Sequence, residues 1–421
     1  MISSDHLPAL QVIVPLLSAP LVMLLTPPGL AWLAATAVAA MSFAIAVAMT
    51  GVILGGEPLT YAMGSWDAPY GIELSVDAFS ALMALLVSGG ALAALLIARP
   101  SVNAQVDAGR QPLFYAAWML VLAGLLGIPV SGDAFNIFVF MEISSLASYI
   151  LIAGGPDRKA LPAVFTYLVM GTIGATFYLI GVGLIYMMTG TLNLTDMAKR
   201  VADVTEMKPV LVAAGFITIG MALKAAVFPL HVWLPNAYTF APHAVTVFLA
   251  ACGTKVALYV LLRFDFLVFQ PNLAGHDLQF GYFLMPLAIA AILVASWVAV
   301  FETRVKRLLA FSSIAQVGYI LLGASFVTGA GMAASLLHMF NHALAKGTLF
   351  IAVAALAMRL PGLAVSDLRG AGRRMPITMA VFVVGGLSLI GVPGTAGFTS
   401  QWWLLTAALD QGALAVRLVA V

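Results

Sequence analysis

Residues 209–264 decide the fold of this chain, and they read PVLVAAGFITIGMALKAAVFPLHVWLPNAYTFAPHAVTVFLAACGTKVALYVLLRF. Two apolar runs flank a segment that contains Pro229 and Pro235. Each run has about the 20 residues that a helix needs to cross a bilayer. Each also carries one lysine, Lys224 in the first and Lys255 in the second. A charge within such a run costs at least about 2.5–3.5 kcal/mol to insert, so both lysines should face a protein interior or a hydrated path.

The whole chain has the composition of a membrane protein. Of its 421 residues, 62% are apolar and 9% are charged, whereas a soluble domain carries about 25% charged residues. The net charge of +2 suggests no nucleic-acid partner. One cysteine, Cys252, cannot form an internal disulfide or hold an iron–sulfur cluster. No P-loop and no dinucleotide-binding GxGxxG motif is found, so the chain lacks the parts for nucleotide hydrolysis or electron transfer, and we expect no cofactor.

Apolar runs of this length predict an all-α, polytopic membrane protein with twelve spans. The spans cover residues 7–26, 30–54, 74–98, 112–131, 134–154, 160–188, 209–228, 242–264, 280–301, 307–328, 330–358 and 376–420. The last run is too long for one helix, and Pro393 and Gly394 in GVPGTAG should break it as Pro229 and Pro235 break the seventh. Two breaks five spans apart predict two inverted repeats, made of spans 4–8 and of span 9 onward.

No low-complexity linker divides the chain, so we expect residues 1–421 to form a single membrane domain. The chain stops in or just after an apolar run, which suggests further spans in a complete relative. With the N-terminus outside, eleven Lys and Arg of the connections lie inside and four outside, which the positive-inside rule favours. This count places Lys306 inside and Arg263 outside. The 189–208 connection mixes both charges and predicts a short surface helix.

A carboxylate in the fifth span is the natural partner for the lysine of the seventh. Glu142 lies within the apolar run IFVFMEISSLASYILI. An opposite charge at about 4 Å is worth about 4 kcal/mol at an effective dielectric constant near 20. Moving Glu142 toward or away from Lys224 could therefore make the lysine hold or release a proton, and Lys255 could favour release by repulsion.

Three ionisable residues share one face of the eleventh span. His338, His342 and Lys346 follow each other at intervals of four residues. The pair of histidines is not a zinc-protease motif, because Met339 stands where that motif has glutamate. No third ligand is close in sequence, and Lys346 would repel a metal ion. We therefore expect no metal here and interpret the line as a proton relay.

Less specific interpretations stay open. Glu142 and Lys224 could form an ion pair whose single role is to hold two helices together. His338 and His342 could be ordinary hydrogen-bonded residues of the core. Three carboxylates near the ends of spans are expected to be solvated: Asp77, Asp133 and Asp265.

Several motifs strongly resemble the antiporter-like subunits of respiratory complex I and of Mrp-type Na+/H+ antiporters. They cover residues 224–263, 302–323 (ETRVKRLLAFSSIAQVGYILLG), 336–350 (LLHMFNHALAKGTLF) and 391–398 (GVPGTAGF), within a stretch of resemblance from 74 to 398. Charged and helix-breaking positions match in order. FMEISSLASYIL and PNAYTFAPHAV are most similar to the D type of Mrp antiporter subunit.

The resemblance implies a proton channel along a central hydrophilic axis. Glu142 matches the fifth-helix glutamate that tunes the seventh-helix lysine, here Lys224. Lys255 matches the eighth-helix lysine, which leads toward a second half-channel. The histidine region of the eleventh helix corresponds to His338 and His342, with Lys346 beside them.

The chain departs from the family pattern in three respects. The family often carries lysine or glutamate shortly after the second helix break, where this chain has Gln401, so the last proton group of the second half-channel is in doubt. Asn236 replaces the acid of a common WLPDAH pattern. The family usually has fourteen spans, so a chain of twelve is a short or incomplete member.

The resemblance further implies an ion-translocating subunit of a larger complex in a bacterial-type plasma (inner) membrane. That complex would be an Mrp-type cation/H+ antiporter or a complex I-like NADH:quinone oxidoreductase, with other membrane subunits as partners. Protons, and sodium as a further candidate, would be the ions. The chain would have no catalytic centre of its own. The alternatives are a self-sufficient secondary transporter of a small solute and a structural scaffold subunit.

Overall fold

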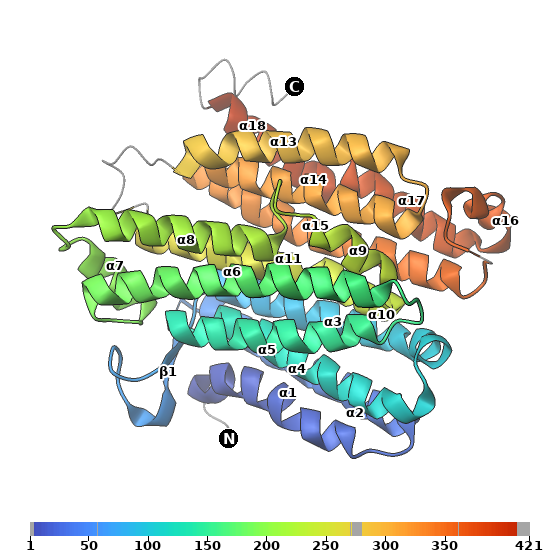
Figure 1. The fold of residues 1–421 in the computed structure, drawn as a ribbon, viewed down its shortest axis with the longest axis horizontal. Coiled ribbons are helices and arrows are strands. Elements are labelled where there is room, and N and C mark those ends of the chain that lie inside the picture. Colours follow the sequence, from blue (N-terminus) through green and yellow to red (C-terminus); the bar gives the residue numbers. More distant parts are fainter. Residues whose placement is uncertain (1–3, 57, 270, 272–279, 361, 411–421) are drawn as a thin grey trace. The chain divides into compact units, whose positions relative to one another are not determined.

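The computed structural model describes residues 4–56, 58–269, 271, 280–360 and 362–410, and these are almost entirely helical (Figure 1). The helices are α1 (Leu7–Met23), α2 (Pro28–Leu54), α3 (Ala78–Gln105), α4 (Gln111–Val130), α5 (Ala134–Ala153), α6 (Ala160–Thr189), α7 (Leu194–Val201), α8 (Met207–Ala225), α9 (Trp233–Phe240), α10 (His243–Phe248), α11 (Thr254–Phe264), α13 (Phe280–Phe301), α14 (Val305–Ser325), α15 (Gly329–Ala357), α16 (Ala371–Arg374), α17 (Pro376–Leu389) and α18 (Ala396–Asp410). The π-helical segments Leu249–Gly253 and Asp265–Phe269 extend α10 and α11 into one long helix.

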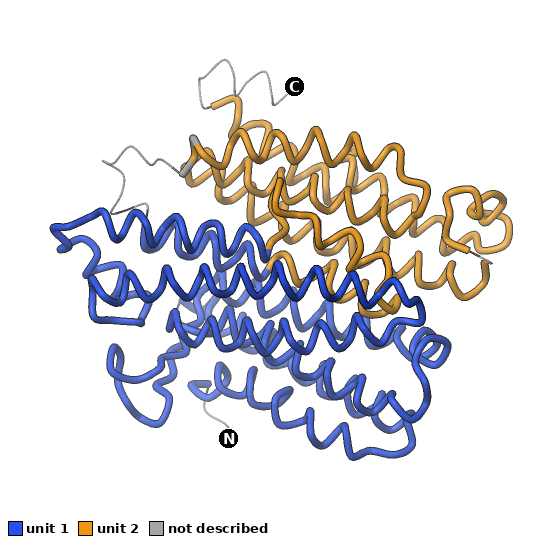
Figure 2. The backbone as a smooth tube through the Cα atoms, in the orientation of Figure 1, with its two compact units in different colours: residues 1–224, 256–275 blue, residues 225–255, 276–421 orange. Residues whose placement is uncertain are grey.

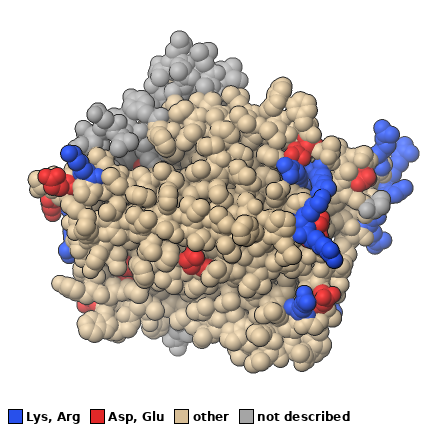
Figure 3. Space-filling view, in the orientation of Figure 1, with Lys and Arg blue, Asp and Glu red and all other residues tan. Residues whose placement is uncertain are grey.

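Within the described residues, eleven helices are long and apolar enough to cross a membrane. Each coincides with one of the first eleven spans expected from the sequence, which confirms a polytopic helical membrane protein. Most of the face visible in Figure 3 carries uncharged side chains, as contact with lipid requires. The helix α7 is the short surface helix expected between residues 189 and 208.

One hairpin departs from the all-helical prediction. Strands β1 (Leu59–Ala62) and β2 (Glu73–Val76) pair antiparallel, with Leu59 opposite Val76. The expectation that the third span begins at residue 74 was therefore wrong. The side chains of β2 alternate between half-buried and buried, as in a strand. Asp77 then starts α3, because its side chain accepts a hydrogen bond from the backbone N–H of Ser80 at 2.9 Å.

The chain divides into two compact units, coloured in Figure 2. Unit 1 comprises residues 1–224 and 256–275, and unit 2 comprises residues 225–255 and 276–421. This division differs from the predicted repeats, because the boundary falls inside the seventh and eighth spans rather than after the eighth. Inverted symmetry between two repeats stays a prediction.

Each unit is built around one helix that several others cover. In unit 1, α1, α2, α3 and α5 pack against α4, whose side chains are nearly all buried and apolar. In unit 2, α10, α14, α17 and α18 pack against α15, which carries buried polar side chains.

The seventh span is interrupted between α8 and α9. Ala226 adopts a positive φ of 56°, and Pro229 lies within the interruption. The prediction that Pro235 also breaks the helix was wrong, since Pro235 is the third residue of α9. A proline is tolerated there because the N–H groups of a first helical turn have no acceptor within the helix.

The twelfth span is interrupted between α17 and α18. Gly391 and Gly394 have positive φ values of 72° and 91°, a conformation that favours glycine, and Pro393 lies between them. The expected span runs from 376 to 420, and its end beyond Asp410 lies outside the described residues.

Candidate functional site

In unit 1, a lysine and a glutamate from two helices form a partly buried ion pair. Lys224 is the next-to-last residue of α8, and its Nζ lies 3.3 Å from Oε1 of Glu142 on α5. The same Nζ donates a hydrogen bond to Oγ of Ser145 at 2.7 Å. The side chain of Lys224 is 6% exposed and that of Glu142 is 28% exposed. The ammonium therefore has one charged and one neutral partner.

Two glycines of α6 make room for this pair. A Cβ atom at Gly171 would clash with the hydroxyl of Tyr149 and would lie 3.9 Å from Nζ of Lys224. A Cβ at Gly174 would lie 2.9 Å from a backbone oxygen of α8 and 3.4 Å from Cγ of Lys224. Any larger residue would force α6 away from α8. Tyr149 in turn interacts with both Glu142 and Ser145.

Ser145, Tyr149 and Gly171 were not predicted from the sequence. A usable signal existed, because Ser145 and Tyr149 follow Glu142 by three and seven residues and so share its helix face. Neutral polar residues are frequent in the spans, however, and only the structure distinguishes the ones that contact the ion pair.

In unit 2, Lys255 is fully buried beside a π-helical segment. Its Nζ donates a hydrogen bond to the carbonyl oxygen of Ala250 at 2.5 Å. The hydroxyl of Tyr238 donates to the neighbouring carbonyl oxygen of Leu249 at 3.0 Å. A π-helical turn disturbs the regular backbone hydrogen bonds, which leaves these two carbonyl groups available to side chains.

The predicted line on α15 is buried in the same unit. His338, His342 and Lys346 are 2%, 1% and 0% exposed. The two imidazole rings are stacked, with centroids 6.4 Å apart. Lys255 is close enough to interact electrostatically with all three residues. Unit 2 therefore holds four ionisable groups in one cluster.

Two members of this cluster differ in their hydrogen bonding. Nζ of Lys346 donates to the carbonyl oxygen of Leu309 at 2.8 Å and to the hydroxyl of Ser312. Both ring nitrogens of His342 lack a partner among the described residues. Buried polar groups without a protein partner are usually satisfied by water, so the surroundings of His342 are suited to hydration.

His338 has partners that suit either protonation state. Its Nε2 lies 2.7 Å from Oε1 of Gln316, and its Nδ1 lies 3.0 Å from Oγ of Ser400. The same hydroxyl lies 3.0 Å from the carbonyl oxygen of Gly397. When His338 is charged, both N–H groups can donate while Ser400 donates to Gly397. When it is neutral, the hydroxyl can turn and donate to Nδ1 instead.

Gln401 carries no titratable proton, and its side chain instead donates a hydrogen bond to the backbone at the second helix break. The carbonyl oxygen of Leu389, the last residue of α17, accepts hydrogen bonds from Nε2 of Gln401 at 3.1 Å and from Nε2 of Gln316 at 3.2 Å. These two amides satisfy a carbonyl group that the interruption leaves without a helical partner. The amide of Gln316 thus connects the break with His338.

Two basic residues counted as loop charges are in fact enclosed by protein. Lys306 is 4% exposed, and its Nζ donates to the carbonyl oxygen of Ala241 at the end of α9, 2.7 Å away. Arg263 donates to both carboxylate oxygens of Asp77, at 2.5 and 2.8 Å. Partial burial raises the pKa of Asp77, but the guanidinium outweighs it and lowers the pKa to about 2.

Two of the carboxylates expected to be solvated are also buried. Asp133 is 7% exposed because it caps α5, accepting a hydrogen bond from the backbone N–H of Asn136 at 2.7 Å. Asp265 is 1% exposed. Among the described residues, no three His, Cys, Asp or Glu side chains lie together as a metal site would require.

These features define the class as a polytopic membrane protein with discontinuous helices and buried ionisable side chains. The family model for the membrane part of NADH:quinone oxidoreductase and Mrp antiporters matches residues 131–421. The chain belongs to this family, so the resemblance inferred from the motifs is confirmed. It is an antiporter-like membrane subunit.

Individual relatives carry both names of the family. NADH-quinone oxidoreductase subunit N of Desulforudis audaxviator is 42% identical over 414 residues, which cover 97% of this chain and 81% of the relative. The D subunit of the Na(+)/H(+) antiporter of Alkalihalophilus pseudofirmus is 32% identical over 351 residues, which cover 82% and 69%. The higher identity of the two thus belongs to the N type and not to the D type that two motifs favoured.

A solved structure has the same fold. A chain in the structure of the membrane-bound sulfane sulfur reductase, an archaeal respiratory membrane complex, matches with a TM-score of 0.92 and 32% identity. The match covers 99% of this chain and 84% of the other.

Proposed function

We propose that this chain moves protons through its buried ionisable side chains, as one membrane subunit of a larger complex. Its relatives are named as subunits of an NADH-quinone oxidoreductase and of a Na(+)/H(+) antiporter, and a similar chain belongs to a respiratory membrane complex. The driving force comes from partner subunits, either through electron transfer or through sodium exchange.

The observation that carries the proposal is the pairing of Lys224 with one charged and one neutral partner. A protonated Lys224 is held by the charge of Glu142 at 3.3 Å. A neutral Lys224 keeps its hydrogen bond with Ser145 at 2.7 Å but loses most of the attraction to the carboxylate. A small movement of Glu142 therefore changes the proton affinity of the lysine without leaving its nitrogen unpartnered.

The cluster of unit 2 supports the same function. The partners of His338 satisfy both of its protonation states, and the surroundings of His342 are suited to hydration. Lys346 ends the line on α15. Transfer of a proton from Lys224 to Lys255 stays a prediction from the sequence.

The test replaces Lys224 by alanine in the assembled complex. We expect Lys224→Ala to abolish coupled proton movement, measured with a pH-sensitive dye in membrane vesicles, while the complex still assembles. Lys208→Ala is the matched control, because Lys208 lies on the same helix α8 but is exposed. Normal proton movement by the assembled Lys224→Ala variant would contradict the proposal and favour a structural scaffold. Movement of a solute by the purified chain alone in liposomes would favour the transporter interpretation.

We further propose that the chain lies in a bacterial plasma membrane with its N-terminus outside, because this orientation places most basic connection residues inside. The sole cysteine, Cys252, is buried, so an added cysteine can be labelled with little background. An impermeant thiol reagent applied to whole cells should label Lys199→Cys and not Arg158→Cys. The reverse labelling pattern would invert the topology.

A further inference from the structure

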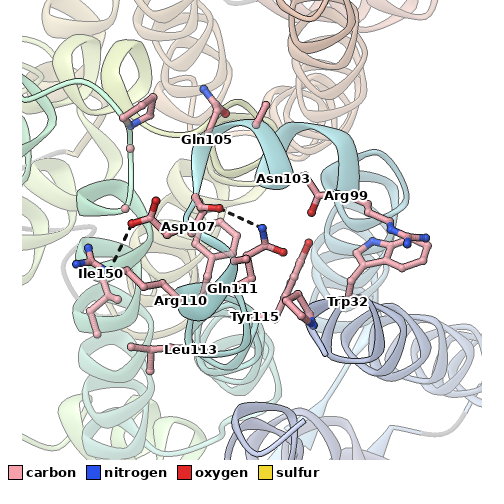
Figure 4. A pocket seen from close by; sticks show the side chains of 18 of the residues that line it. Trp32, Arg99, Asn103, Gln105, Asp107, Arg110, Gln111, Leu113, Tyr115 and Ile150 are labelled. Atoms are coloured by element: carbon pink, nitrogen blue, oxygen red, sulfur yellow. Dashed lines mark hydrogen bonds and ion pairs between the residues drawn. The ribbon is translucent and has the colours of Figure 1, made fainter. Parts of the chain in front are cut away.

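Unit 1 contains a pocket that the proton pathway does not use. Its volume is about 1200 Å³, at or above the upper end of the roughly 300–1,000 Å³ of ordinary ligand pockets. It lies where α2 and α4 begin and where α3 and α5 end. Figure 4 shows side chains from these ends around it, among them Trp32, Arg99, Arg110 and Tyr115.

The positive charge of this pocket is only partly neutralised. Arg99 stacks on Trp32, with its Cζ 5.2 Å from the ring centroid, and none of the ion pairs among the described residues involves it. Arg110 lies 3.9 Å from Asp107, but both side chains are at least 80% exposed, so this pair compensates little charge.

The N-terminus of α2 adds to the positive potential. The guanidinium of Arg99 lies beside the first turn of α2, since a Cβ at Gly29 would be 3.6 Å from its Nη2. No side chain caps α2, whereas at α4, which also borders the pocket, the N–H of Gln111 already donates to the carbonyl oxygen of Ala108. The positive end of a helix dipole beside an arginine favours an anion between them.

A buried hydroxyl independently indicates a ligand. Tyr115 is 1% exposed, and its hydroxyl has no hydrogen-bond partner among the described residues. Figure 4 shows its ring reaching toward Arg99 and Asn103 within the pocket. A buried hydroxyl without a partner is unfavourable, and an anionic oxygen at this position would give it one.

The side of the pocket across from Arg99 carries two apolar side chains beside the Asp107–Arg110 pair. Leu113 and Ile150 line it and are 49% and 52% exposed. Figure 4 shows them across the pocket from Arg99 and Trp32. Apolar side chains exposed beside cationic ones suit a molecule that joins a phosphate to hydrocarbon.

We propose that this pocket binds the headgroup of an anionic phospholipid, with the phosphate between Arg99 and Tyr115 and the acyl chains along Leu113 and Ile150. Free phosphate has the same anionic chemistry, but it has no hydrocarbon to contact Leu113 and Ile150. Basic pockets among the ends of membrane helices are known to hold such headgroups.

The test is the thermal unfolding of the full chain in neutral detergent with added phosphatidylglycerol, phosphatidylcholine or inorganic phosphate. A ligand that binds only the folded state raises the melting temperature. We expect phosphatidylglycerol to raise it and the other two to leave it nearly unchanged. Equal shifts with both lipids, or a full shift with phosphate alone, would overturn the lipid assignment.

Three variants locate the binding. Arg99→Gln should weaken phosphatidylglycerol binding about tenfold, because it removes a charged donor. Tyr115→Phe should weaken binding about threefold to tenfold, and it should not harm the fold because the hydroxyl has no partner to lose. Arg158→Gln is the control, since Arg158 is exposed at the same end of α5 but does not line the pocket. Equal losses for Arg158→Gln and Arg99→Gln would show unspecific attraction and overturn the proposal.

Discussion

In unit 1, the buried ammonium of Lys224 has a carboxylate partner, Glu142, 3.3 Å away. In unit 2, the ammonium groups of Lys255 and Lys346 donate instead to backbone carbonyl oxygens. A carboxylate attracts a cation more strongly than a carbonyl dipole does, and it can move with its side chain. The first ammonium is therefore held by a charge, whereas the other two are held by backbone dipoles.

The largest loss of proton movement is expected when the charge of Glu142 is removed. We expect Glu142→Gln to reduce proton movement at least about tenfold, because an attraction of about 4 kcal/mol at this distance is lost while the shape is kept. Glu206→Gln, the same change at an exposed position, should have no effect in the same vesicle assay. Unchanged proton movement in Glu142→Gln would mean that charge does not control the first site.

A second experiment compares the lysines of the two units. Lys346→Met should reduce proton movement several-fold but keep or raise the melting temperature, because Lys346 has no carboxylate among its hydrogen-bond partners. Lys224→Met should lower the melting temperature, because it leaves Glu142 without its cation. Equal thermal effects of the two variants would contradict the distinction between the sites.

A smaller effect is expected for His338. His338→Ala should reduce proton movement only in part, since His342 and Lys346 of the same line remain. The loss should be smaller than for Lys224→Ala in the same assay. A loss as complete as that of Lys224→Ala would place His338 at an obligatory step.

The smallest effect concerns Gln401, which binds the second helix break. Gln401→Leu should destabilise the fold by about 1 kcal/mol, because the carbonyl oxygen of Leu389 loses one of two donors. Gln401→Lys keeps a donor and should be close to the wild type in thermal unfolding. If both variants unfold alike, the amide does not stabilise the break.

Most of the fold could be predicted because crossing a bilayer imposes a length. About 20 apolar residues are needed for each span, and in the described part of the chain eleven such runs form helices long enough to cross a membrane. The start of α3 was misplaced because the residues of β2 are also apolar enough to extend the run. The predicted break at Pro235 was wrong because Pro235 lies in the first turn of α9, where the missing N–H has no acceptor within the helix.

The ionisable members of the site could be predicted because a charge in an apolar run is costly and therefore conspicuous. Their neutral partners could not be predicted, since Ser145, Gln316 and Ser400 resemble many other polar residues of the spans. Lys306 and Arg263 were predicted to be charges of the connections. Both lie near the ends of apolar runs, where a sequence does not distinguish a residue in solvent from one buried in protein.

The amino-acid order alone predicts a chain that crosses a membrane many times, interruptions in the seventh and twelfth spans, and a few charges within the apolar runs. These conclusions depend on the free energy of transferring each residue into lipid, which is a property of that residue and does not require the tertiary structure. The tertiary structure alone decided which groups meet: Lys224 with Glu142 and Ser145, and His338 with Gln316 and Ser400. Hydrogen bonds between helices tolerate deviations of only about a few tenths of an ångström from their ideal length, and the packing of the whole unit sets that length.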